Sequence, residues 1–266
     1  MTSGNQAIEG IGVSPDGRWL AFDSNRNGNQ DIYRMPLAGG EMEQLTTSFA
    51  DDFTPAWSPD GKEIVFFSWR SGSRDIFLMG ADGSSQRQLT SDPGHEWYPD
   101  WSPDGKHIAY RSIQQAKDTL AVLTRTADGA AWEAPRELAT PGGWPRWSPD
   151  GRLIAYPALG RSLRVVSPQG GPPRILVESK DPAVVPAPGF AAWSKDSRTV
   201  YYKAYDAEGH SSFWAVPAAG GTPTLLVKFD DPARQSYRIE FTTNGERFFF
   251  TIAHYQSDIF VMDVQK

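Results

Sequence analysis

Short runs of apolar residues alternate with polar, turn-forming segments along the whole chain. Each run is followed by a segment in which apolar and polar residues alternate, and in most cases then by a turn that contains glycine. The apolar runs occupy residues 19–22, 64–67, 108–110, 153–156, 200–202 and 248–250. Runs of this length, rich in β-branched and aromatic residues and bounded by Gly, Pro, Asn and Asp, are typical of strands. No helical period longer than a turn or two is visible, so the pattern predicts an all-β protein.

A five-residue motif, called here the anchor motif, precedes each apolar run. It reads Trp-Ser-Pro-Asp-Gly in its clearest copies, and its six copies begin at residues 13, 57, 101, 147, 193 and 241. Within it, Pro, Asp and Gly have the properties that a tight turn requires. The aromatic residue at its start is large and apolar, so we expect it to be buried between neighbouring sheets. This prediction applies to Trp57, Trp101, Trp147 and Trp193.

The spacing of the anchor motif determines the predicted architecture. Successive copies begin 44, 44, 46, 46 and 48 residues apart, and most units contain four candidate strands. Such a period predicts a six-bladed β-propeller of four-stranded antiparallel sheets, in one domain that spans residues 1–266. The last unit ends after its third strand, at residues 258–264, and an unpaired edge invites pairing with other chains. We therefore expect residues 2–8 to pair with 258–264 and to tie the two termini together.

The repeat also resembles a known family. Residues 55–90 contain Pro-x-Trp-Ser-Pro-Asp-Gly-Lys, then Ile-Val-Phe-Phe, Ser-x-Arg, Asp-Ile-Phe, Asp-Gly and Gln-Leu-Thr, and residues 24–28 fit the same pattern. This is similar to the TolB-type propeller repeat; the resemblance covers essentially the whole chain and is sharpest in the first three units. It implies a bacterial propeller. Similar repeats occur in periplasmic TolB, in the propellers of tricorn and prolyl-oligopeptidase-like peptidases, and beside bacterial kinases and winged-helix regulators. In these proteins the repeat specifies architecture and not chemistry.

Composition and charge exclude several classes of protein. The chain has 26 Lys and Arg against 32 Asp and Glu, a net charge of −6, and no basic block, which argues against nucleic-acid binding. It has no cysteine and no apolar stretch of about 18 residues, so we expect no disulfide and no membrane insertion. The first residues do not read as a signal peptide. Both the periplasm and the cytoplasm stay open as the compartment.

The predicted strand order sorts the loops onto two faces. The anchor turns and the glycine turns lie on one face, called here the anchor face. The variable segments lie on the opposite face, called here the loop face, where function in a rigid scaffold is usually found. We expect a ligand site there, at the mouth of the central channel, formed by Asp52, Arg70, Glu96, Trp97, Tyr98, Arg111, Trp144, Tyr237, Arg238 and His254, with Trp69 and Phe190 beside them. The alternative is that these side chains only close the channel and bind one another.

No catalytic residue is assigned. The four histidines show no metal-binding spacing, and the segment 209–213 lacks the closing glycine of a nucleophile elbow. Asp52 and Glu96 suit a hard cation such as calcium, which is the alternative to a site without a cofactor. The arginines between residues 70 and 74 are expected to lie in a solvated loop, and the aspartates that begin the third strands are expected to bind adjacent loops.

The leading hypothesis is a non-catalytic binding or scaffold propeller, monomeric as a domain, that docks a protein segment or a small polar ligand at the channel mouth. One alternative is a metal-assisted lyase or hydrolase that uses the same residues. A second alternative is a sensor domain excised from a larger protein, such as a bacterial kinase or regulator.

Overall fold

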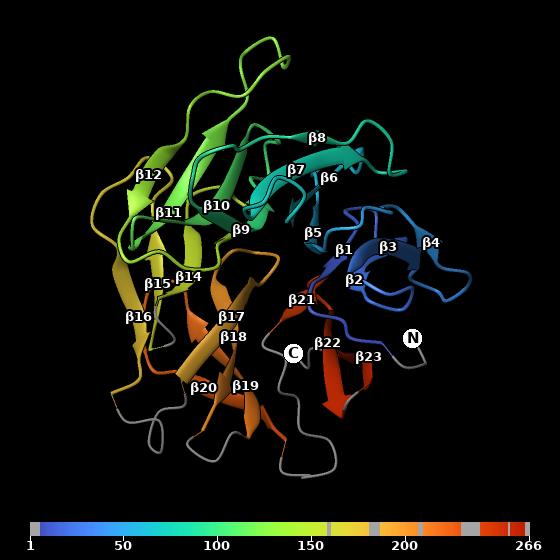
Figure 1. Ribbon diagram of the computed structural model, residues 1–266. Coiled ribbons are helices and arrows are strands. Elements are labelled where there is room, and N and C mark those ends of the chain that lie inside the picture. The colour runs from blue at the N-terminus through green and yellow to red at the C-terminus, as the bar shows by residue number, and fades with distance from the viewer. Residues whose placement is uncertain are drawn as a thin grey trace.

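The computed structural model describes residues 6–158, 161–180, 187–206, 210–229, 240–254 and 256–263. Every regular element in these residues is a strand, and no described helix could cross a membrane. The strands form six antiparallel sheets, each in sequence order, and the sheets are arranged as the blades of a ring (Figure 1). The predicted six-bladed β-propeller is therefore confirmed. Five sheets have four strands, and the sixth has three within the described residues.

The first three blades lie within the sharpest repeats. Their strands are β1 (Ile11–Val13), β2 (Trp19–Ser24), β3 (Asp31–Pro36) and β4 (Glu43–Gln44); β5 (Asp52–Trp57), β6 (Glu63–Ser68), β7 (Asp75–Gly80) and β8 (Arg87–Gln88); and β9 (His95–Trp101), β10 (His107–Gln114), β11 (Lys117–Thr124) and β12 (Arg136–Ala139).

The last three blades follow the same order. Their strands are β13 (Arg146–Trp147), β14 (Ile154–Ala158), β15 (Ser162–Val166) and β16 (Arg174–Glu178); β17 (Ala187–Trp193), β18 (Thr199–Tyr205), β19 (Ser211–Pro217) and β20 (Thr224–Lys228); and β21 (Phe241–Thr243), β22 (Arg247–His254) and β23 (Gln256–Asp263).

The anchor motif forms the turn between the first and second strands of each blade. In blade 2 the Ser58 hydroxyl donates to the Asp60 carboxylate at 2.7 Å, and Asp60 accepts the backbone N–H of Lys62 at 3.1 Å. The Ser58 oxygen in turn accepts the N–H of Glu63 at 2.9 Å. Gly61 has a φ of 70°, in the left-handed region that glycine adopts without strain. The motif is thus a self-contained turn, which explains why it recurs with so little change.

The tryptophans of the anchor motif pack between blades, as predicted. Trp101, Trp147 and Trp193 are buried in three separate hydrophobic clusters, each of which joins two blades. Trp57 is only half-buried; its indole N–H donates to the carbonyl of Gly12 in the preceding blade at 3.1 Å. These contacts give each blade an apolar interface with the next.

The ring closes where blade 6 meets blade 1, and residues 6–8 contribute a contact other than the predicted strand pairing. Residues 6–8, the described part of the 2–8 segment, form no strand; residues 2–5 and 264 lie outside the described residues. Gln6 and Ala7 instead bind Ser24 and Asn25 of blade 1. The fully buried Ile8 joins a cluster that includes Phe249 and Ile259 of blade 6. The buried side chain of Ile8 therefore links the first and last blades. The residues around it are mostly polar and have little strand propensity.

Candidate functional site

Irregular inner strands shape the central channel. Strands β5, β9 and β17 each contain a bulge near the middle, where their pairing with the second strand of the blade shifts register. Two bulge residues one repeat apart, Thr54 and Tyr98, have φ values of 51° and 54°. Left-handed backbone at a non-glycine residue is uncommon and re-aims the side chain. In blade 3 this geometry brings the Tyr98 ring against aromatic residues of three other blades, including Phe67 of β6, whose ring centroid lies 5.8 Å away.

Aromatic rings from three blades meet at Tyr98. Its ring centroid lies 5.3 Å from that of Trp144, which precedes β13, and 5.3 Å from that of Phe190 in β17. Trp144 and Phe190 stack with centroids 4.9 Å apart. Burial raises the pKa of the Tyr98 phenol well above its usual range. Tyr98 and Trp144, both predicted as site residues, thus lie together with Phe190 as an aromatic cluster between blades.

A second group of side chains lies on the loop face beside this cluster. We call it the Arg74 platform; it consists of Trp69 and Arg74 from the β6–β7 loop and His95 and Trp97 from β9. The Arg74 guanidinium carbon lies 3.9 Å from the Trp97 ring centroid and 4.4 Å from that of Trp69. The His95 ring packs near both indoles, with its centroid 5.7 Å from that of Trp69 and 6.5 Å from that of Trp97. All four residues are half-buried, so the platform is only partly covered by protein.

Two arginines at the platform differ in their partners. Arg111, in β10, lies 5.3 Å from the Trp97 ring and binds both carboxylate oxygens of Asp118, at 2.8 and 2.9 Å. The Arg74 guanidinium has no hydrogen bond or ion pair to any described residue. Burial, together with the nearby positive charge of Arg111, lowers the pKa of Arg74, as expected for a desolvated cation. Arg74 is therefore a half-buried positive charge on this face that forms no ion pair with a described carboxylate.

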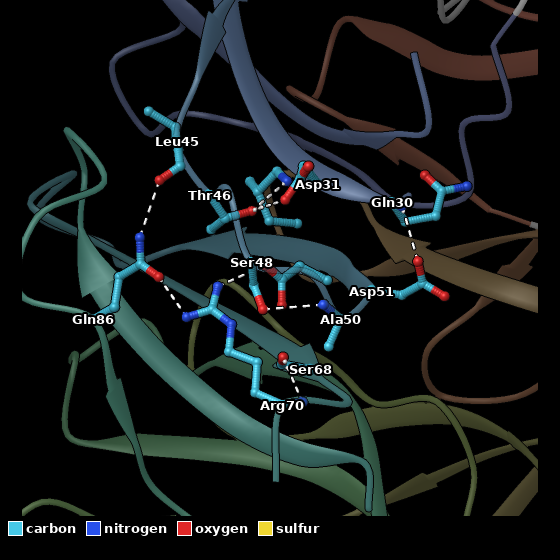
Figure 2. Close-up of polar contacts among 12 residues, drawn as sticks. Gln30, Asp31, Leu45, Thr46, Ser48, Ala50, Asp51, Ser68, Arg70 and Gln86 are labelled. Atoms are coloured by element: carbon cyan, nitrogen blue, oxygen red, sulfur yellow. Dashed lines mark hydrogen bonds and ion pairs between the residues drawn. The ribbon is translucent and has the colours of Figure 1, made fainter. Parts of the chain in front are cut away.

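Asp52 and Arg70, also predicted as site residues, bind each other within blade 2, beside its junction with blade 1. Their side chains are joined at 2.6 Å, and Asp52 is fully buried. Arg70 also donates to Gln86, and Asp31 lies beside this pair in the neighbouring blade, where it accepts from Thr46 (Figure 2). The pair thus lies within blade 2, and Gln86 links it to blade 1 by donating to the Leu45 carbonyl at 3.1 Å.

Glu96 occupies the position one repeat after Asp52 and is also fully buried. Its carboxyl accepts from Ser112 at 3.2 Å and lies 3.4 Å from the Thr90 hydroxyl. Burial, with the charges of Asp75 and Asp92 nearby, raises the pKa of Glu96 to about 7. The same position in two repeats therefore has a paired carboxylate in one and a weakly acidic carboxyl in the other.

Of the third-strand aspartates, Asp75 binds its adjacent loop, as expected, and the side chain of Asp258 lies outside those described. Asp75 accepts hydrogen bonds from Ser71 and Ser73 of the preceding loop and from Thr90. Tyr237 and Arg238 lie outside the described residues; His254 ends β22, but its side chain is not among those described. Within the described part of the chain, no three His, Asp or Glu side chains gather as a metal site would require.

Arg74 is the residue that the sequence interpretation missed. The arginines after residue 69 match the repeat pattern, which favoured a solvated loop. A sharper signal is the pair Trp69, which begins the loop, and Trp97, which lies in the next repeat. An arginine that lies between two tryptophans in space stacks on them. That signal requires knowing that β9 lies next to the β6–β7 loop.

The comparisons identify the family. The sequence model of the TolB beta propeller domain matches residues 11–169, more than half of the chain. The chain belongs to this family. A curated relative, the uncharacterized protein Atu1656 of Agrobacterium fabrum, is 38% identical over 55 residues, which cover 21% of this chain and only about a fifth (19%) of that protein.

Solved structures share the propeller fold of this TolB-family chain at low identity. A candidate TolB from Agrobacterium tumefaciens is 24% identical with a TM-score of 0.70, covering 84% of this chain and 82% of that one. An oligogalacturonate lyase from Vibrio parahaemolyticus is 12% identical, with a TM-score of 0.66 and coverage of 100% and 93%. A chain of a nidogen/laminin complex is 14% identical, with a TM-score of 0.67 and coverage of 85% and 81%. An enzyme and a member of a protein complex are thus similarly close in fold, so function has to be argued from the site.

Proposed function

We propose that this chain is a non-catalytic binding propeller that docks a protein segment on its loop face, at the Arg74 platform. The observation that carries the proposal is the Arg74 guanidinium itself. It packs against two indole rings, is half-buried, and has no acidic partner among the described residues. An arginine in this state retains hydrogen-bonding capacity that a ligand can use.

The composition of the platform suits a peptide. Tryptophan and arginine are the residue types most enriched among those that dominate binding energy at protein interfaces. Trp69, His95 and Trp97 offer aromatic surface, while Arg74 offers donors. The neighbouring cluster of Tyr98, Trp144 and Phe190 supports the platform from the channel side because Trp97 and Tyr98 stack at 6.2 Å. The nidogen/laminin complex, which contains a chain of this fold, supports a protein partner in general.

The proposal can be tested with random peptides displayed on phage and selected against the immobilised propeller. The affinity of the enriched peptides would then be measured by calorimetry with the wild type and with Trp97→Ala. Because Trp97 contributes the ring closest to Arg74, we expect its truncation to weaken binding about tenfold or more.

Trp132→Ala is the matched control. Trp132 lies in the β11–β12 connection on the anchor face and also packs against an arginine, Arg125, at 4.9 Å. Its removal should leave peptide affinity unchanged. Selection that yields no binder, or binders equally sensitive to both substitutions, would contradict a docking site on the loop face.

A further inference from the structure

An arginine packed against two tryptophans occurs at two places in the described chain. On the loop face, Arg74 packs against Trp69 and Trp97. On the anchor face, the Arg125 guanidinium carbon lies 5.3 Å from the Trp101 ring centroid and 4.9 Å from that of Trp132. The two arrangements bury the face of a guanidinium against indole rings, which leaves its N–H edges for hydrogen bonds.

The Arg125 arrangement includes an acidic partner from the protein. Its guanidinium is joined to a carboxylate oxygen of Glu63, in the preceding blade, at 2.5 Å. Both side chains are about one-fifth exposed. At this depth a carboxylate compensates the desolvated cation and fixes its orientation.

At Arg74 no described residue supplies the equivalent carboxylate. The adjacent carboxylate of Asp118 is bound at both oxygens by Arg111. Asp75, the next residue along the chain, accepts from Ser71, Ser73 and Thr90. Among the described residues, the acidic groups whose charges raise the pKa of Arg74 are the Tyr98 phenol and, more weakly, the Glu9 carboxyl. Neither forms a hydrogen bond or an ion pair with the Arg74 guanidinium.

We propose that the Arg74 platform binds the side-chain carboxylate of an aspartate or glutamate within the docked segment. This inference rests on the proposed function and narrows its ligand to an acidic peptide. The ligand carboxylate takes the place that Glu63 takes at Arg125 and accepts an N–H group from the guanidinium edge. The methylene groups of the ligand side chain then lie against the indoles of Trp69 and Trp97. A side-chain carboxylate is favoured over a chain terminus because the matching site in this protein is filled by a glutamate side chain.

The inference can be tested without a selected peptide. The probes are N-acetylglutamate amide and its neutral isostere N-acetylglutamine amide, titrated into the protein while NMR monitors the arginine Nε–H and indole N–H signals. We expect the glutamate probe to shift the signals of Arg74 and Trp97 and to bind about tenfold more tightly than the glutamine probe, as for a hydrogen bond to a charged group. The Arg125 signal should not move.

Three protein variants control this measurement. Arg74→Gln should abolish the preference for glutamate over glutamine, and Arg74→Lys, which keeps the charge but loses the planar fork, should retain part of it. Arg125→Gln should leave the preference intact. Thermal unfolding of each variant establishes that it is folded, and the lysine variant keeps the test valid should the glutamine variant prove unstable.

The outcomes separate this inference from the proposed function. Equal binding of the two amide probes overturns the inference, and so does tighter binding of N-acetylglycine, whose carboxylate is a chain terminus. Selected peptides could bind the wild type and Arg74→Gln equally and lose affinity with Trp97→Ala. That result would support the docking function and contradict the acidic ligand. If the glutamate probe binds but selection yields no peptide, the carboxylate site is supported and the docking of a protein segment is contradicted.

Discussion

Two junctions between neighbouring blades use equivalent positions one repeat apart and compensate their buried acids differently. Between blades 1 and 2, Asp31 and Asp52 lie near Arg70, which binds Asp52 directly. Between blades 2 and 3 the equivalent acids are Asp75 and Glu96, and the position of Arg70 is taken by Gln114.

The missing arginine affects the protonation of Glu96 at the second junction. Without an arginine, burial raises the pKa of Glu96 from about 4.5 to about 7. The Thr90 hydroxyl lies 3.4 Å from both Asp75 and Glu96, but it has a single proton to donate. At a pH below about 7, the raised pKa of Glu96 makes its own proton available as the second donor. The comparison predicts that the same repeated geometry is stabilised by a cation at the first junction and by a proton at the second.

The largest effect should follow loss of the cation. Arg70→Ala leaves the fully buried Asp52 without its charged partner, and we expect a loss of about 3 kcal/mol in the free energy of unfolding. Urea denaturation at pH 7 measures this loss. Adding Asp52→Asn to the same chain should restore most of it. A single variant as stable as the wild type would show that Arg70 does not compensate the buried charge of Asp52.

The second junction should make stability depend on pH. Because the folded-state pKa of Glu96 is raised, its favourable contribution is complete below pH 4.5 and is lost as the pH rises through about 7. Glu96→Gln removes this dependence. We expect the variant to exceed the wild type by about 2 kcal/mol at pH 8 and to match it near pH 5. Parallel stability–pH curves for the two proteins would mean that Glu96 is ionised in the native state.

Gln114→Arg should give the second junction an arginine beside its buried carboxylate, as Arg70 lies beside Asp52 at the first junction. A guanidinium at this position would favour the ionised form of Glu96 and lower its pKa, stabilising the protein at pH 8 by about 1 kcal/mol. Gln115→Arg adds the same charge at the next, exposed residue and is the control. If the two variants have the same stability–pH curve, position 114 does not reach Glu96.

The smallest difference should come from the threonines. Thr46 and Thr90 both accept the backbone N–H of the third strand at 2.9 Å, so valine at either position should cost about 1 kcal/mol. Thr46 serves one carboxyl, whereas Thr90 serves two. Thr90→Val should therefore be the more destabilising by about 0.5 kcal/mol at pH 5, and the reverse order in urea denaturation would contradict the shared-proton arrangement.

Local signals were sufficient to predict the fold. The anchor motif contains the residues that form its turn, and apolar runs at a constant spacing allow few architectures other than a closed ring of sheets. The same reasoning placed Trp101, Trp147 and Trp193 between blades, because a large aromatic side chain at the start of each repeat has to be buried.

The sequence alone also determined the family, the loop face and several of the aromatic residues on it. It could not separate residues that bind each other from residues left for a ligand. Asp52, Arg70 and Arg74 all appear as charged loop residues, yet two of them are paired and one is not. That distinction depends on which side chains of neighbouring blades come within about 3 Å, and the electrostatic energy of a buried charge is set by those distances. Only the packing of blade 3 against blade 2 decided that Arg74 lies against two indoles without an acid.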